Sequence, residues 1–277
     1  MTLNEYYELD SSYKINIDTL TSLISTIPDF VYIDLIESYK NNTTITTTPI
    51  LNTSQVTDAK NCFQDAKLKV FDSTLWDVSK LTNCEGLLRG CDELVFVNLE
   101  GFRGVPLTNV QYMFHYCNCC FLDLTPLDIS NLTSLLSMCQ YMKKLTTFKI
   151  GDTSHITNFN SFLGGANNLC KVPLMNMSSA TNMNSFFQGW DECKLLTDIE
   201  GFVNLKCKWD DNNGLAKCPN VSRQSYINIF SNLYDFTGNG ETPTSSQGKI
   251  KLHPNYLTVC TQEDIDIALR KGWQISV

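Results

Sequence analysis

Apolar and polar positions recur along the middle of the chain with a period of about 25 residues. Each unit contains a threonine that we use as its anchor. Mainly apolar residues stand two, five and six positions after each anchor, a spacing that places them on one face of a helix. Because threonine is a favourable N-cap, each unit predicts a short helix after its anchor. The anchors are Thr57, Thr82, Thr108, Thr133, Thr157 and Thr181.

A second pattern, in which apolar and polar residues alternate, follows in most units. Alternation over four or five residues predicts a short strand with one buried face. One strand and one short helix in each such unit, at about 25 residues, lies within the range of leucine-rich repeats. We therefore predict an α/β repeat solenoid of the leucine-rich-repeat type, whose successive strands pair in parallel. The predicted strands cover residues 95–99, 121–124, 147–150 and 171–174.

The repeat divides the chain into three regions. Residues 1–48 do not fit the unit; we expect helices over 20–27 and 31–39 and an N-terminal cap or anchoring arm. Residues 49–220 are the predicted solenoid, with an irregular last coil. Residues 221–277 predict a cap that covers the terminal apolar face of the solenoid. Its expected elements are a helix over 222–235, a strand over 249–252, a helix opened by a capping box of Thr261 and Asp264 and ended by Gly272, and a strand over 273–277.

Two segments carry a resemblance to a known family. Residues 76–83 (WDVSKLTN) and 178–189 (SSATNMNSFFQG) resemble the repeat unit of BspA-like leucine-rich-repeat surface proteins, including the mycoplasma-lipoprotein type. Residues 225–235, together with residues 271–273, resemble the capping segment of such proteins from gut bacteria and their phages. The resemblance implies a leucine-rich-repeat fold and a protein that is secreted, lipid-anchored or carried on a virion.

Composition narrows the classes of partner. Lys and Arg number 21 against 29 Asp and Glu, a net charge of −8, and no basic block is present. Such a chain lacks the basic footprint of a nucleic-acid-binding protein. No window holds the roughly 18 to 20 apolar residues of a membrane span, and the acidic N-terminus lacks the pattern of a secretory signal. We therefore expect neither nucleic-acid binding, nor a membrane span, nor a conventional secretory route, and we expect the twelve cysteines to be mostly reduced thiols.

Two kinds of chemistry compete with a purely binding role. His115, Cys117, Cys119 and Cys120 lie within six residues, but their spacing differs from that of paired zinc ligands, and Cys117 occupies a small-residue repeat position. The three histidines belong to no recognisable nucleophile motif. We therefore expect no metal, no cofactor and no catalytic residue. A glycan-active enzyme with carboxylates converging on the concave face remains the alternative from another class.

The outward positions of the strands are the candidate binding residues, because in a leucine-rich solenoid they form one continuous face. They are equally compatible with ordinary solvated sheet residues. Our hypothesis is a non-enzymatic recognition or structural module, a fibre, decoration or tail-associated component of a phage virion; a bacterial surface adhesin is the alternative. The expected partner is a virion or host-surface protein, with glycans as a second class and self-assembly through residues 1–48. The candidate residues are Phe96, Asn98, Asp123, Thr147, Lys149, Lys171, Pro173 and Asp198.

Overall fold

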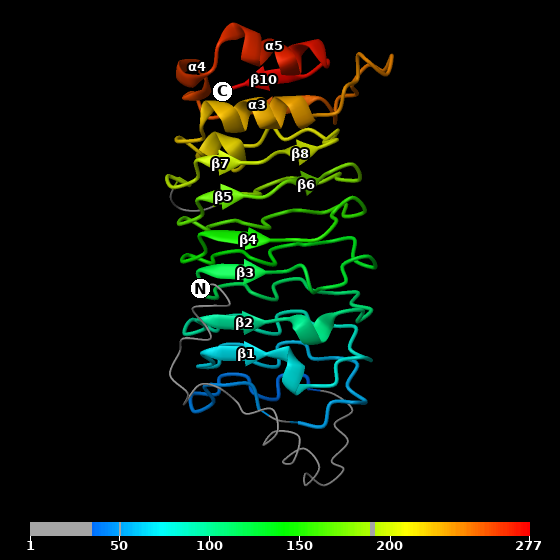
Figure 1. The fold of residues 1–277 in the computed structure, drawn as a ribbon, viewed down its shortest axis with the longest axis vertical. Coiled ribbons are helices and arrows are strands. Elements are labelled where there is room, and N and C mark those ends of the chain that lie inside the picture. Colours follow the sequence, from blue (N-terminus) through cyan, green and yellow to red (C-terminus); the bar gives the residue numbers. More distant parts are fainter. Residues whose placement is uncertain (1–34, 50, 189–191) are drawn as a thin grey trace.

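The computed structural model describes residues 35–49, 51–188 and 192–277. Successive segments of about 25 residues lie on top of one another and form a tall column (Figure 1). The described N-terminal segment lies at one end of the column, and the C-terminal helices lie at the other. No helix within the described ranges is long and apolar enough to cross a membrane.

In the described part of the chain, short strands pair in five two-stranded sheets, and β1 to β5 and β7 lie one above the next along the column (Figure 1). The pairs are β1 with β2, β3 with β4, β5 with β7, β6 with β8 and β9 with β10, and all five are parallel. The strands span Val70–Asp72 (β1), Phe96–Asn98 (β2), Phe121–Asp123 (β3), Thr147–Lys149 (β4), Lys171–Val172 (β5), Met175–Asn176 (β6), Asp198–Ile199 (β7), Phe202–Val203 (β8), Lys249–Lys251 (β9) and Gln274–Ser276 (β10). Four of them, β2 to β5, lie within the strands predicted by alternation.

The short helices predicted after the threonine anchors are absent from the described coils, which form consecutive turns there. Backbone N–H groups alternate between two kinds of partner. The N–H groups of Asn61 and Phe63 donate to the next coil, at 2.8 Å from Glu85 O and 2.9 Å from Leu87 O. Between them, the N–H of Cys62 closes a turn onto Ala59 O at 3.1 Å. In an α-helix every N–H would bond four residues back, so the donors that now reach the next coil would be unavailable for stacking.

Left-handed residues explain why the helix does not form. The residues four and eight positions after each anchor have positive φ wherever they are described. A left-handed residue reverses the local path of the chain and cannot continue a right-handed helix. The residues two, five and six positions after each anchor are nevertheless buried in every unit, as the periodicity predicted. The left-handed residues are Asn61, Gly86, Tyr112, Ser137, Ser161 and Ser185 in one column, and Asp65, Gly90, Tyr116, Tyr141 and Gly165 in the other.

Residues 35–48 follow the same backbone pattern, although the sequence analysis assigned them to a cap or arm. Glu37 and Asn41 have positive φ and are four residues apart, as in the later coils. The N–H groups of Leu35 and Tyr39 donate to the next coil, at 3.0 and 2.8 Å. Residues 36–41 therefore form turns, not the end of the helix predicted over 31–39, and residue 48 marks no change of backbone pattern. The helix predicted over 20–27 lies outside the described residues.

The interior of the column is filled by apolar side chains, and sulfur substitutes for carbon at several positions. All twelve cysteines are free, and nine of them are buried. Cys91 and Cys117 stand at equivalent positions in neighbouring coils, and their thiols donate to the carbonyls of Phe63 and Leu88 in the preceding coil, at 3.1 and 3.0 Å. Burial raises the pKa of the Cys91 thiol to about 12. These cysteines thus act as small core residues that also hold neighbouring coils together.

Helices are concentrated at the C-terminal end. Thr261 and Asp264 form the predicted capping box at the start of α5, in which each side chain accepts from the other residue's N–H. Arg223 of α3 donates two hydrogen bonds to the Asp264 carboxylate, at 2.8 and 3.0 Å, and so ties α3 to α5. The helices span Arg223–Asn232 (α3), Tyr256–Val259 (α4) and Gln262–Arg270 (α5), and three-residue 3-10 helices span Ser73–Leu75, Glu100–Phe102 and Leu215–Lys217.

Candidate functional site

Strands β1 to β5 and β7 lie one above the next along the column (Figure 1), and we call the surface carried by their outward residues the strand face. The register aligns Phe96 with Val70, Thr147 with Phe121, and Lys171 with Asp198. The middle residues of β1, β3 and β4 point inward and are buried; they are Phe71, Leu122 and Phe148. The structure places the predicted residues Phe96 and Asn98 on β2, Asp123 on β3, Thr147 and Lys149 on β4, Lys171 on β5, Pro173 just after β5, and Asp198 on β7.

Charged residues of the strand face pair with one another along the stack. Lys149 Nζ lies 3.5 Å from Asp123 Oδ2. Lys171 Nζ lies 3.2 Å from Asp198 and 2.6 Å from Glu200, and all these side chains are substantially exposed. Exposed ion pairs of this kind contribute about 0 to 1 kcal/mol each. Because they neutralise one another, these charges give the part of the strand face formed by β3 to β7 little net field with which to attract a charged partner.

An apolar patch occupies the strand face at β2 and β3. It consists of Val95, Phe96, Cys120 and Phe121: Val95 is 54% exposed, Cys120 is exposed, and the two phenylalanines are half-buried. Lys149 Nζ lies 5.7 Å from the centre of the Phe121 ring and borders the patch. Grouped exposed apolar side chains are typical of contact surfaces. Of these residues, only Phe96 was a predicted binding residue, although Phe121 is likewise the first residue of the next strand.

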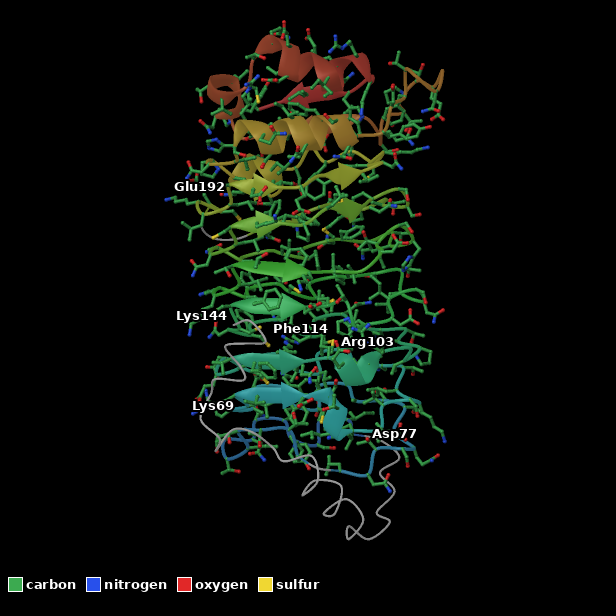
Figure 2. All side chains as sticks on the ribbon, in the orientation of Figure 1. Lys69, Asp77, Arg103, Phe114, Lys144 and Glu192 are labelled. Atoms are coloured by element: carbon green, nitrogen blue, oxygen red, sulfur yellow. The ribbon has the colours of Figure 1, made fainter. Side chains whose placement is uncertain are left out.

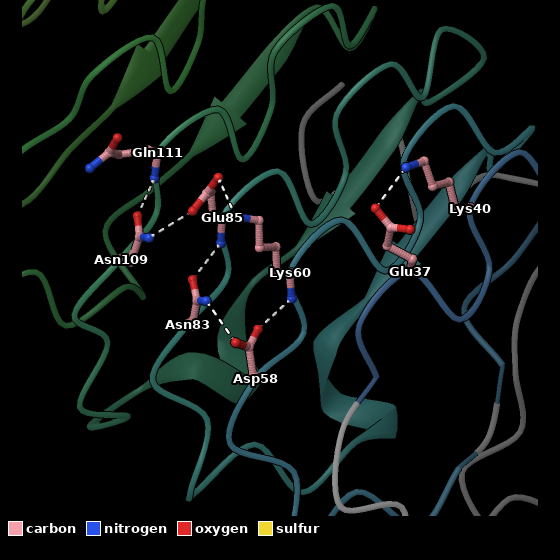
Figure 3. A network of polar contacts seen from close by, with 8 residues as sticks. All are labelled: Glu37, Lys40, Asp58, Lys60, Asn83, Glu85, Asn109 and Gln111. Atoms are coloured by element: carbon pink, nitrogen blue, oxygen red, sulfur yellow. Dashed lines mark hydrogen bonds and ion pairs between the residues drawn. The ribbon is translucent and has the colours of Figure 1, made fainter.

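A second wall carries threonine and asparagine ladders. Thr82 Oγ1 donates to Thr57 O at 3.1 Å, and Thr108 Oγ1 donates to Thr82 O at 3.2 Å. Figure 3 shows the neighbouring amide column, in which Asn83 Nδ2 donates to Asp58 at 2.9 Å and Asn109 Nδ2 donates to Glu85 at 3.2 Å. These donors bond neighbouring coils. The recurring Thr-Asn pair therefore serves coil stacking, and not helix capping as the sequence analysis expected.

Aromatic side chains of two neighbouring coils pack together in a group that we call the aromatic cluster: Tyr112, His115, Tyr116 and Tyr141. The rings of Tyr116 and Tyr141 stack with centroids 4.8 Å apart and an interplanar angle of 15°. His115 is only 7% exposed and meets the other three rings edge-on, 4.4 Å from Tyr116 and 5.7 Å from each of the others. Burial, with a smaller contribution from Arg89, lowers the pKa of His115 to about 4, so its imidazole is neutral at pH 7.

The cysteines near His115 do not converge on it as ligands. Cys117 and Cys119 are buried, Cys120 is exposed on the strand face, and the Cys117 thiol bonds a backbone carbonyl. Within the described ranges no group of three or more His, Cys, Asp or Glu side chains is arranged to hold a metal ion.

Several carboxylates have pKa values below their ordinary range. Hydrogen bonds from Ser79 lower the pKa of Asp77, and those from Ser154 lower that of Asp152. The hydrogen bond from Lys171 lowers the pKa of Glu200. Every shift resolved for a carboxylate in the described part of the chain is downward. These carboxylates stay ionised at neutral pH, whereas a general acid requires a raised pKa.

Figure 2 shows how side chains are distributed over the column. Phe114 lies inside, where it is fully buried, while Lys69, Lys144 and Glu192 lie along one long edge. A shallow hollow of about 250 Å³ lies where residues 178–181 meet the C-terminal region. Its one charged side chain, Lys206, already lies 3.7 Å from the centre of the Tyr234 ring. The hollow is lined by Ser178, Ser179, Ala180, Thr181, Lys206, Cys207, Ser246 and Gln247.

Comparison with known proteins gives one match. Neither the curated proteins nor the solved structures include a match to this chain. Residues 33–150 match a family described as "Mycoplasma protein of unknown function, DUF285". The matched segment begins two residues before the first described coil and ends just after β4. In this segment, the chain is similar to the Mycoplasma family DUF285, which agrees with its resemblance to mycoplasma-type proteins.

Proposed function

We propose that the protein is a leucine-rich-repeat-type solenoid that recognises a protein partner through its strand face, without a covalent step. The observation that carries this proposal is the apolar patch of Val95, Phe96, Cys120 and Phe121 on a wall of paired strands. The strands beneath it are fixed by pairing and by buried side chains, so the patch is preorganised for binding.

The composition of the strand face suits a protein surface. Protein interfaces combine an apolar centre that excludes charge with a polar rim. Here the apolar patch is the centre, and the ion-paired residues Asp123, Lys149 and Lys171 lie on the rim side. Of the predicted binding residues, Phe96 belongs to the proposed centre, and the charged ones and Thr147 belong to its border.

We further propose a phage virion as the setting, as a fibre, decoration or tail-associated component. The support is the resemblance of residues 225–235 and 271–273 to capping segments found in phages of gut bacteria. The alternative setting is a bacterial cell surface, on which the protein would act as an adhesin. Mass spectrometry of purified phage particles distinguishes the two settings. The protein is expected in the particle, and its absence there would contradict the virion proposal and favour the adhesin.

The binding proposal is tested with purified protein in surface plasmon resonance against virion proteins and host-surface proteins from the same source. Val95→Ser is expected to weaken binding at least tenfold, because a polar group replaces an apolar contact in the centre. Leu257→Ser is the matched control: Leu257 is 58% exposed, similar to Val95, but lies on α4. Equal losses in both variants, or no loss in Val95→Ser, would contradict the role of the strand face.

A further inference from the structure

The three tyrosines of the aromatic cluster all lie in the left-handed region of backbone conformation. Tyr112 has φ of 59°, Tyr116 of 65° and Tyr141 of 59°. Bulky residues rarely adopt this conformation, which glycine, asparagine and aspartate adopt more easily. At equivalent positions the neighbouring coils have Gly86, Asp65, Gly90, Ser137 and Gly165. Among the described coils, aromatic side chains therefore occupy these unfavourable positions in this one region alone.

The surroundings of the tyrosines keep the rings in place and leave one of them accessible. His115 contacts all three rings from beneath, and the ring of Tyr141 occupies the space where a side chain at position 165 would begin. Gly90 precedes Tyr116 in the same column and contributes no side chain to it. Tyr116 is 46% exposed. Backbone strain that recurs at one surface, and that holds a rigid exposed aromatic ring, is typical of a ligand-binding site.

We propose that the aromatic cluster is a carbohydrate-binding site in which a neutral pyranose ring stacks on Tyr116. The C–H groups on one face of a pyranose carry partial positive charge, and they complement the negative face of an aromatic ring. The hydroxyl groups of the cluster tyrosines supply hydrogen-bond donors and acceptors for the hydroxyls of the sugar.

Charge favours a neutral ligand over a cation or a polyanion. The protein's own Arg89 lies 5.7 Å from the centre of the Tyr112 ring, and its positive charge beside the cluster disfavours a second cation there. The net charge of −8 opposes binding of a polyanion such as a nucleic acid. The cluster lies on a different part of each coil from the strand face, so this site is independent of the proposed protein-binding surface.

The test combines glycan titration with thermal unfolding of the full chain. The probes are neutral oligomers of glucose, galactose and N-acetylglucosamine, each titrated by calorimetry and by saturation-transfer NMR. At least one is expected to bind, and Tyr116→Asn is expected to weaken that binding at least tenfold. Because asparagine tolerates positive φ, the melting temperature of Tyr116→Asn is expected to stay unchanged or to rise.

Two control variants separate this role from a structural one. Tyr234→Asn removes a tyrosine that lies outside the left-handed positions and whose hydroxyl donates to Glu241 at 2.7 Å; it is expected to lower the melting temperature and to leave glycan binding intact. Val95→Ser is expected to bind glycan normally, whatever its effect on the protein partner. The proposal is overturned if none of the probes binds, or if Tyr116→Asn binds as wild type. It is also overturned if Tyr116→Asn lowers the melting temperature as much as Tyr234→Asn, since the tyrosine would then be structural.

Discussion

Single threonine hydroxyl groups link several coils to the coil before them. The carbonyl of Thr57 accepts both the N–H and the Oγ1 of Thr82, at 2.9 and 3.1 Å. The carbonyl of Thr82 accepts the same two donors from Thr108, at 2.8 and 3.2 Å. The hydroxyl of each of these threonines thus exchanges a hydrogen bond to water for one to the preceding coil. Such an exchange stabilises the folded state by about 1 kcal/mol.

Thr82→Val tests this ladder, because valine keeps the shape and removes the hydroxyl. We expect a loss of about 1 kcal/mol in the free energy of unfolding, measured by urea denaturation. Thr125→Val is the control, since the Thr125 hydroxyl donates only to Asp123, two residues away. If both variants lose the same free energy of unfolding, the bond between coils contributes no more to stability than the local bond of Thr125.

His115 makes the stability of the protein sensitive to mild acid. Its pKa of about 4 in the folded protein lies below the ordinary value of 6.5, so the unfolded chain binds a proton more readily. The stabilisation from the neutral imidazole is complete above pH 6.5 and is lost as the pH falls towards 4. We expect His115→Phe to remove this part of the decline in melting temperature, and His155→Gln to retain it. An unchanged pH profile in His115→Phe would show that His115 does not titrate as described.

At the scale of elements, the C-terminal helices and the coils differ in how well local sequence specifies them. Thr261, Asp264 and Gly272 act on their own neighbours, so α5 and its limits follow from sequence. The conformation of the coils depends instead on bonds between one coil and the next. Serine and tyrosine at left-handed positions give no local signal, whereas the glycines, Asn61 and Asp65 hint at positive φ. Buried periodicity was therefore predictable, whereas the turn conformation and the coil at 35–48 were not.

The link between α3 and α5 is expected to weaken in acid. Two hydrogen bonds from Arg223, together with the backbone bond from Thr261, lower the pKa of Asp264 to about 2. Because the folded pKa lies below the ordinary value, this stabilisation is present above about pH 4 and is lost between pH 4 and pH 2. Asp264→Asn is expected to be less stable than wild type at pH 7. It is also expected to lose no stability from this group between pH 4 and pH 2. Asp266→Asn, which alters a carboxylate that accepts from Gln262, should behave as wild type in thermal unfolding at both pH values.

Across the whole molecule, a coil is bonded chiefly to the coils directly above and below it. Bridges join Asn83 to Asp58 and to Asn109, and then Asn158 to Ser134 and to Asn182, always between neighbouring coils. Stability in such a stack is the sum of the contributions of single coils and of the interfaces between them. One complete coil is therefore expected to be removable without loss of the fold.

Deletion of residues 134–157 joins Thr133 to Asn158 and so preserves the order of equivalent positions. We expect a folded protein with a lower melting temperature, and small-angle scattering should find it shorter by about 5 Å. Deletion of residues 134–145 removes half a coil and is expected to unfold the chain, because the following left-handed positions no longer align. Equal folding of both variants, measured by circular dichroism, would refute the stacking of equivalent positions.

The bonds between coils, such as that from Phe63 N to Leu87 O, run along the length of the column. A pull on the two ends of the column is therefore expected to detach the coils from the stack one at a time. Each released coil adds about 25 residues of chain, roughly 80 to 90 Å when extended. Under tension the protein would lengthen in equal steps, and the coils that had not yet opened would keep their outer surfaces intact.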